Sequence, residues 1–294
     1  MIMKRMKKIF AVLLLATLLS PAAIAELIPV DYQLRGKRIG DFVSPSLYFT
    51  VDKIQIAKEP CFVTAICMED PGKQIKKATS QWETNLLLPS DMAQQIEDPA
   101  LVINGSGYVS PQFPWIPEDY PGTNSDYYYT PLGSLTITNG EIFRNLEGVS
   151  YYGLTLEEDG LHMYVNADNE TVLAASPSQT WSFYTGCPLI ENHESIVDTE
   201  WRFANAHAMR TIIAKKDAHN YVILTVTNQG SKRGLTLLQC IDWLKETVDP
   251  IWAYDLDGGP SSALLRHKQG EDHLRTVWGN KNKDADIMAF VELK

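Results

Sequence analysis

Apolar and polar residues alternate over short stretches in most of the chain, which is the period-two pattern of β-strands. The alternation is clearest over residues 48–56, 61–68 and 132–142. Residue pairs that favour tight turns interrupt it and predict hairpins. These pairs are Asn139-Gly140, Asp159-Gly160 and Lys216-Asp217. The pattern therefore predicts a predominantly β protein.

Two segments predict helices. The first covers residues 90–96, which follow a proline and contain helix-forming residues. The second covers residues 236–248, where Thr236 and Gln239 form a capping box and apolar residues recur on one face. A further strand at 251–256 is expected to follow this helix directly.

These elements predict an α+β fold: a single β-rich domain with mixed or antiparallel sheets and a few helices. The sequence has no internal repeat and no linker that would divide the chain. We expect a signal peptide at 1–25, an N-terminal extension at 26–45 and one domain at 46–294.

One long segment, 111–131, has no periodicity and is rich in Pro, Tyr, Asp and Ser. A loop of this length typically covers or forms a functional site. Its aromatic residues, from Trp115 to Tyr129, are expected either to stack on sugar faces or to pack within the loop itself.

The N-terminus has the features of a secretory signal. Basic residues up to Lys8 precede an apolar run at 9–19, and Ala23-Ile24-Ala25 is a typical cleavage site. We therefore expect a secreted, extracytoplasmic protein with no membrane-spanning segment in its mature chain. The space outside the cytoplasm permits disulfides. The four cysteines allow three connectivities, and the sequence does not select one of them. The cysteines are Cys61, Cys67, Cys187 and Cys240.

The net charge of the chain limits the classes of partner that we expect. The formal net charge is −10 over 294 residues, and removing the four cations of the leader would take it to −14. Such a surface repels nucleic acid and anionic lipid, so neither is an expected partner. An anionic substrate would require local cations and backbone donors. The oligomeric state is left open.

The most informative candidate site is the segment 254–262. A strand brings Asp255 and Asp257, which face the same way, to a Gly258-Gly259 turn whose amides are expected to bind an oxyanion. Ser261 and Ser262 add hydroxyl groups. The alternative is a strand that simply ends in a tight turn capped by an aspartate.

Two further segments add polar groups next to apolar strands. Asn104 follows the strand 101–103 and is expected to orient a sugar hydroxyl or a water molecule, unless it only forms an Asn-Gly turn. Arg210 begins another strand and offers bidentate pairing to phosphate, or alternatively an ordinary ion pair.

Five motifs in this order resemble the phosphodiester glycosidase family, which includes a lysosomal enzyme that removes N-acetylglucosamine from a sugar-1-phosphate diester, and secreted bacterial relatives. The resemblance extends from about Tyr48 to the C-terminus. The motifs are Asn104-Gly105-Ser106-Gly107, Thr185-Gly186-Cys187-Pro188-Leu189-Ile190, Arg210-Thr211, Gly234-Leu235-Thr236-Leu237 and Asp257-Gly258-Gly259-Pro260-Ser261-Ser262.

The resemblance implies a hydrolase of a sugar-1-phosphodiester that acts on a phosphorylated glycan. We expect no cofactor. Arg210, the Gly258 and Gly259 amides and Ser261 or Ser262 are expected to hold the phosphate, with Thr211 beside them. Asp257 is expected to stabilise the sugar cation or activate water, and Asn104 to orient the sugar or that water. Repulsion between Asp255 and Asp257 is expected to raise the pKa of one carboxyl toward an acid role.

Several alternatives remain. A serine hydrolase would pair Ser261 with His267 or His273. A structural calcium ion is an alternative at 255–258 or at the acidic turn 166–170. His207, Lys232 and Arg233 are expected either to approach the anionic substrate or to be ordinary loop residues. A glycan-binding domain without catalysis is the alternative function, suggested by Ser106 and Pro260, which depart from the family pattern. The sugar and its acceptor are not defined.

Overall fold

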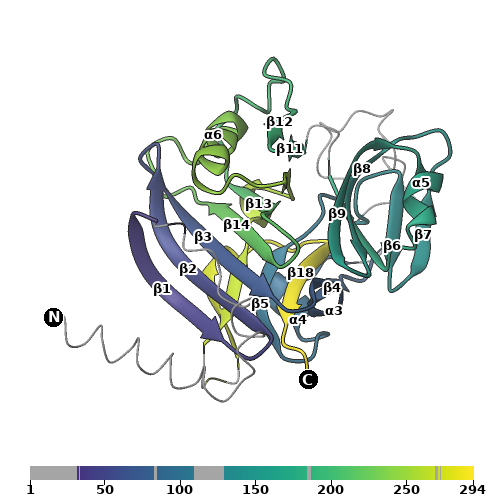
Figure 1. Ribbon diagram of the computed structural model, residues 1–294, viewed down its shortest axis with the longest axis horizontal. Coiled ribbons are helices and arrows are strands. Elements are labelled where there is room, and N and C mark those ends of the chain that lie inside the picture. The colour runs from purple at the N-terminus through teal and green to yellow at the C-terminus, as the bar shows by residue number, and fades with distance from the viewer. Residues whose placement is uncertain are drawn as a thin grey trace.

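A computed structural model describes residues 32, 34–82, 85–108, 129–183, 187–268, 271 and 273–294. Within these residues the protein is mostly antiparallel β-sheet with a few short helices, which confirms the predicted fold class. Figure 1 shows the long strands β1 to β3 on one side of the molecule and the hairpins around β6 to β9 on the other. The expected signal peptide and most of the loop 111–131 lie outside the described residues.

The largest sheet has eight strands, and the predicted strands at 48–56, 61–68 and 251–256 all lie in it. The expected N-terminal extension contributes its edge strand β1, which pairs with β2. In spatial order the strands are β1 (Gly36–Val43), β2 (Leu47–Ile56), β3 (Glu59–Met68), β14 (Asn220–Val226), β13 (Arg210–Lys215), β15 (Trp252–Asp255), β11 (Pro188–Glu191) and β12 (Glu194–Ser195).

Smaller sheets complete the fold. The second sheet contains β17 (Leu274–Trp278), β16 (Leu264–His267), β5 (Pro99–Asn104), β18 (Asp286–Val291) and β4 (Ile75–Thr79). The others contain β10 (Gln179–Ser182), β8 (Tyr151–Glu157) and β9 (Gly160–Ala167), and the pair β6 (Leu135–Thr138) and β7 (Glu141–Asn145). The three predicted hairpin turns join β6 to β7, β8 to β9 and β13 to β14.

The helices are α3 (Pro71–Gln74), α4 (Pro89–Ala93), α5 (Asn169–Ala174) and α6 (Leu237–Thr247), with a 3-10 turn η2 (Gly259–Ser261). In α6 the predicted capping box is present, because the Thr236 hydroxyl accepts from the Gln239 amide and the Gln239 side chain accepts from the Thr236 amide. The helix expected at 90–96 is shorter: α4 ends at Ala93, and turns follow it.

The core follows from the alternation along the strands. On β13, Ile213 packs between the two large sheets, while its neighbour Ile212 faces the opposite side, where α6 covers the sheet. Figure 1 shows α6 lying across this part of the large sheet. The four cysteines are all buried thiols in the structure. No helix within the described ranges is long and apolar enough to cross a bilayer.

Candidate active site

Asn104, at the end of β5, is the hydrogen-bonding centre of the site. Its side chain is fully buried. Its Oδ1 accepts from the Thr211 hydroxyl at 2.7 Å and from the Ala263 amide at 2.9 Å, and its Nδ2 donates to the Asp257 carbonyl at 2.7 Å. One amide therefore ties together β5, the start of β13 and both ends of the 257–263 turn. Both ends of the Asn104 amide are therefore occupied by protein groups.

Arg210 and Asp255 form a buried ion pair on the adjacent strands β13 and β15. Arg210 Nη1 lies 3.1 Å from Asp255 Oδ2, and the two side chains are 9% and 2% exposed. Arg210 Nη2 also donates to the carbonyls of Phe203 and Ala206. Burial raises the pKa of Asp255 to about 6, although the guanidinium acts to lower it. Arg210 Nη1 and Asp255 Oδ2 therefore bind each other, while Arg210 Nε and Asp255 Oδ1 are buried without a hydrogen-bond partner.

The expected anion cradle at Gly258 and Gly259 is corrected by the structure. The Gly258 amide donates to the Asp257 carboxylate at 2.8 Å, and the Gly259 amide donates to the Met209 carbonyl at 2.9 Å. The amides of Ser261 and Ser262 donate to the carbonyls of the two glycines, within η2. The turn is thus folded around internal hydrogen bonds, and its amides do not point toward a ligand.

Asp257 lies where this turn opens to solvent. Its side chain is half-buried, and a Cβ built on the neighbouring Gly259 would meet no atom within 4 Å. Desolvation by the surrounding protein raises the pKa of Asp257 to about 7, opposed by hydrogen bonding from Ser261 and Gly258. The charge of Asp255 adds to the increase. A half-buried carboxyl that titrates near neutrality is suited to proton transfer.

A second acid, Asp284, was not predicted from the sequence and interacts with Asp257 and Ser261 of the same turn. Asp284 is 1% exposed, and neither of its carboxyl oxygens makes a hydrogen bond of good geometry. Burial and the charges of Asp257 and Asp286 raise its pKa well above the usual range, and Ser261 interacts with it. The signal that singled out Asp255 and Asp257 is also present here, because Asp284 and Asp286 are spaced alike at the start of an apolar strand.

Asp286 belongs to a separate buried network. It pairs with Lys77 at 2.9 Å, and both side chains are fully buried. It also accepts from the amide and hydroxyl of Ser106, at 2.6 and 2.9 Å. A Cβ on Gly105 would lie 2.0 Å from Asp286 Oδ1, so the glycine makes this contact possible. Ser106 thus holds the start of β18 against the end of β5.

Exposed cations line two loops beside Arg210. The loops are joined by reciprocal hydrogen bonds between Ala208 and Leu235, and Met209 contacts the glycine turn. His207 lies on one loop, where its Nδ1 is 2.9 Å from the Gly234 carbonyl. The exposed cationic or titratable residues of these loops are Arg202, His207, Lys232 and Arg233. The segment between β14 and α6, which carries Lys232 and Arg233, contains no acidic residue and is locally basic, whereas the other loop also carries the exposed acids Asp198 and Glu200.

The histidines proposed for a serine triad are engaged elsewhere. The His267 ring packs edge-on against Phe42, and His273 lies 3.8 Å from Glu271. The polar neighbours that interact with Ser261 are carboxyls and Tyr108. The arrangement favours carboxyl chemistry over a serine nucleophile.

The acidic turn considered for calcium has a structural role. Asp168 caps α5 by accepting from the Thr171 amide, and Asn169 is hydrogen-bonded to Ser134 and Asn145. Asp255, in the other segment considered, is the partner of Arg210.

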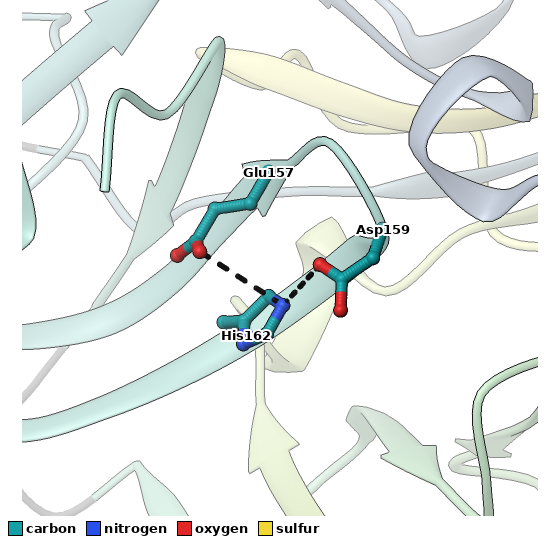
Figure 2. Close-up of side chains that lie close together, drawn as sticks. All are labelled: Glu157, Asp159 and His162. Carbon is teal, nitrogen blue, oxygen red and sulfur yellow. Dashed lines mark hydrogen bonds and ion pairs between the residues drawn. The ribbon is translucent and has the colours of Figure 1, made fainter.

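One group within the described ranges brings three possible metal ligands within 4.8 Å of one another: Glu157, Asp159 and His162. Figure 2 shows the His162 ring facing both acids, at 2.6 Å from Asp159 and 3.9 Å from Glu157. Glu157 also accepts from Thr155 and Tyr164. These contacts describe a hydrogen-bonded hairpin, and the group lies outside the Asn104–Asp257 site.

Comparison with known proteins finds a matching family and solved structures of similar fold. The profile of the phosphodiester glycosidase family matches residues 99–289. The catalytic domain of zebrafish N-acetylglucosamine-1-phosphodiester alpha-N-acetylglucosaminidase, auto-inhibited by its pro-peptide, has a similar structure, with a TM-score of 0.63 and 16% identity over 85% of each chain. A hypothetical protein from Synechocystis also has a similar structure, with a TM-score of 0.54 and 12% identity over 85% of this chain and 63% of that one. No curated protein matches significantly. At these identities the solved structures show a shared fold.

Proposed function

The chain belongs to the phosphodiester glycosidase family, and on this basis we propose that it hydrolyses the glycosidic bond of a sugar-1-phosphodiester. The observation that carries the proposal is the convergence of three sequence motifs on one hydrogen-bonded site. Asn104, Thr211 and the 257–263 turn lie far apart in the chain and are joined directly. The zebrafish relative is named for an N-acetylglucosamine-1-phosphodiester, which suggests the substrate class but not the sugar.

Asp257 is the reacting carboxyl in this proposal. The residue is half-buried, so part of it is accessible to a bound sugar. In its ionised form it would stabilise positive charge at the anomeric carbon or accept the proton of the attacking water. A pKa of about 7 gives it a substantial ionised fraction at neutral pH.

The other predicted residues take supporting roles. Asn104 fixes the Asp257 main chain, and Thr211 fixes Asn104. Arg210 neutralises Asp255, so that only part of the local negative charge opposes an incoming phosphate. We assign these three residues to positioning rather than to direct phosphate contact.

Phosphate recognition is assigned to hydroxyls and to the basic loop that carries Lys232 and Arg233. The Ser262 hydroxyl is buried and makes no hydrogen bond, so a group at the site could serve as its partner. Lys232 and Arg233 are exposed on the loop joined to the Met209 segment. Their charges would attract the diester despite the overall negative field. A phosphodiester leaves as a weakly basic phosphate, so binding its charge is a large part of the catalytic task.

We further propose that the protein acts outside the cytoplasm, after removal of residues 1–25. The support is the basic, apolar and small-residue pattern of the leader. Mass spectrometry of the exported protein should give a mature chain that begins at Glu26.

The decisive test is turnover of sugar-1-phosphodiesters, including one of N-acetylglucosamine, measured as release of free sugar and a phosphomonoester. Asp257→Asn should remove turnover while leaving the circular dichroism spectrum unchanged. Asp52→Asn is the matched control, because Asp52 is also a buried acid but pairs with Arg38 on β1. Binding of glycan with no product after many hours would contradict the hydrolase and favour a binding domain.

A further inference from the structure

The strands β1 and β2, at the edge of the large sheet, carry exposed cations (Figure 1). In the register of this pair Lys37 lies directly opposite Lys53, and both residues are exposed. Arg35, two residues before Lys37, is also exposed. Like charges directly opposite each other destabilise a pair of strands. The arrangement is therefore more favourable when an anionic group lies between the two ammonium groups.

The same three cations line one pocket. Its volume is about 350 Å³, a size typical of sites for small ligands. The lining also includes Gln55 and Pro60, and none of the described residues that form it is acidic. In the part of the chain that the structure describes, no acid forms an ion pair with Arg35, Lys37 or Lys53. The pocket therefore offers positive charge to an incoming anion.

Two acidic residues adjacent in sequence to the pocket are engaged elsewhere. Asp52 alternates with Lys53 along β2, so it points to the opposite face of the strand, where it pairs with Arg38 at 2.8 Å. Glu59, at the start of β3, is 1% exposed and accepts hydrogen bonds from the loop that carries Lys232. Neither carboxylate pairs with the cations of the pocket, which leaves their charge available to a ligand.

Hydrogen bonds connect this pocket to the basic loop. The carbonyl of Pro60, which lines the pocket, accepts from the Thr227 hydroxyl at 2.7 Å. Glu59 accepts from the main-chain amides of Lys232 and Gly234, at 2.9 and 3.2 Å. The start of β3 thus lines the pocket and also holds the basic loop in place.

The basic loop leads on to the active site. Leu235 and Ala208 exchange main-chain hydrogen bonds of 3.1 Å. The carbonyl of Met209, the next residue, accepts from the Gly259 amide at 2.9 Å. The pocket, the basic loop and the turn that carries Asp257 are therefore parts of one continuous structure, with positive charge at two separate places along it.

We propose that the pocket of Arg35, Lys37 and Lys53 binds a phosphodiester group of a polymeric phosphorylated glycan while another sugar-1-phosphodiester of the same polymer occupies the active site. The inference rests on the proposed function and narrows its substrate to a polymer that carries more than one phosphate. The glycan passes over the basic loop of Lys232 and Arg233, which connects the two sites.

The charges of the protein favour such a substrate. A guanidinium group pairs with phosphate through two hydrogen bonds, and ammonium groups add point charges. The chain as a whole is negative, so an anionic polymer binds only where cations gather. A polymer that occupies two cationic sites at once binds more tightly than a small diester that occupies one, because its second contact is intramolecular.

The binding test uses a dextran modified with N-acetylglucosamine-1-phosphodiesters, and unmodified dextran, in calorimetry on Asp257→Asn protein, so that the polymer is not consumed. Adding Lys37→Gln with Lys53→Gln should weaken binding of the modified dextran about tenfold at low salt. Lys73→Gln with Lys76→Gln is the matched control, because it removes two exposed lysines of α3 and β4, and it should bind like the parent. Equal affinities of the two double variants, or equal binding of unmodified dextran, overturn the proposal.

Replacing Lys37 and Lys53 tests the pocket without a cost in folding. The two ammonium groups repel each other across the strands, so the double variant should melt at a temperature no lower than that of wild type. A lower melting temperature would show that the two lysines stabilise the fold, and it would overturn their assignment to a ligand site.

Turnover separates this inference from the proposed function. With a small sugar-1-phosphodiester, the Lys37 and Lys53 double variant should keep the wild-type KM, because this substrate reaches only the active site. With the modified dextran its KM should rise about tenfold at unchanged kcat. If the small diester is hydrolysed and the variant binds the polymer like the control, the pocket fails while the proposed function stands. If binding differs as expected and no diester is hydrolysed, the proposed function fails while the anion pocket stands.

Discussion

The side-chain amide of Asn104 donates a 2.7 Å hydrogen bond to the main-chain carbonyl of Asp257, 153 positions later in the chain. This contact joins the second sheet to the turn that follows the large sheet. Because the same side chain also accepts from Thr211 and Ala263, the position of the reacting carboxyl depends on one buried amide.

Replacing Asn104 with Ala should therefore destabilise the protein by about 3 kcal/mol, because three buried hydrogen bonds are lost and their partners are left without replacements. Thr211→Val removes only one of the three and should cost about 1 kcal/mol. Urea unfolding at neutral pH measures both. Equal costs for the two variants would contradict the central role of Asn104.

The two glycines of the turn should respond differently to alanine. A Cβ on Gly258 would lie 2.8 Å from the Met209 carbonyl, so Gly258→Ala should push the turn away from β13 and lower activity at least tenfold. Gly259 has φ +58° but open space around it, so Gly259→Ala should cost about 1 kcal/mol of backbone strain. Turnover assays on both variants report displacement of the turn, and unfolding measurements report the backbone strain.

Stability should depend on pH through Asp257. Its pKa is about 7 in the folded protein, above the ordinary value of 3.8, so the folded state binds its proton more tightly than the unfolded state does. The contribution is fully present below about pH 4 and is lost as the pH rises through 7. In Asp257→Asn the melting temperature should fall less between pH 4 and 8 than in wild type. An equal fall in melting temperature between pH 4 and 8 in the two proteins would contradict the assignment of this pH dependence to Asp257.

Replacing only one partner of the Lys77–Asp286 ion pair should strongly destabilise the protein. Both side chains are fully buried, so Lys77→Met leaves an uncompensated carboxylate and should cost about 3–5 kcal/mol. Adding Asp286→Asn removes that charge and should restore part of the loss. Denaturant midpoints of the single and double variants provide the measurement, and a double variant no more stable than the single one would refute the account.

The basic loop that carries Lys232 and Arg233 should affect substrate binding more than the chemical step. Changing Lys232 and Arg233 to Ala together should raise KM several-fold and leave kcat nearly constant, because exposed charges attract the substrate without contacting the reacting atoms. The difference from wild type should shrink at high salt. A matched change at Lys37 and Lys53, on β1 and β2, should leave KM unaltered.

Local signals made much of this protein predictable. Strand alternation, the hairpin turns and the Thr236–Gln239 capping box depend on residues close in sequence, and all were confirmed. The ordered motifs also identified the family from the chain alone. The early end of α4 at Ala93 and the structural role of the 166–170 turn were not predicted, because they depend on packing and on side-chain hydrogen bonds.

The roles within the site depended on tertiary structure. The sequence by itself determined that Asn104, Arg210 and Asp257 are polar residues at strand ends, within a β-rich fold. Only the fold decided that Arg210 pairs with Asp255, that the glycine amides donate inward and that Asp284 is enclosed beside Ser261. The physical reason is that hydrogen-bond partners and desolvation are set by neighbours distant in the chain, whereas strand and helix patterns are set by neighbours a few residues away.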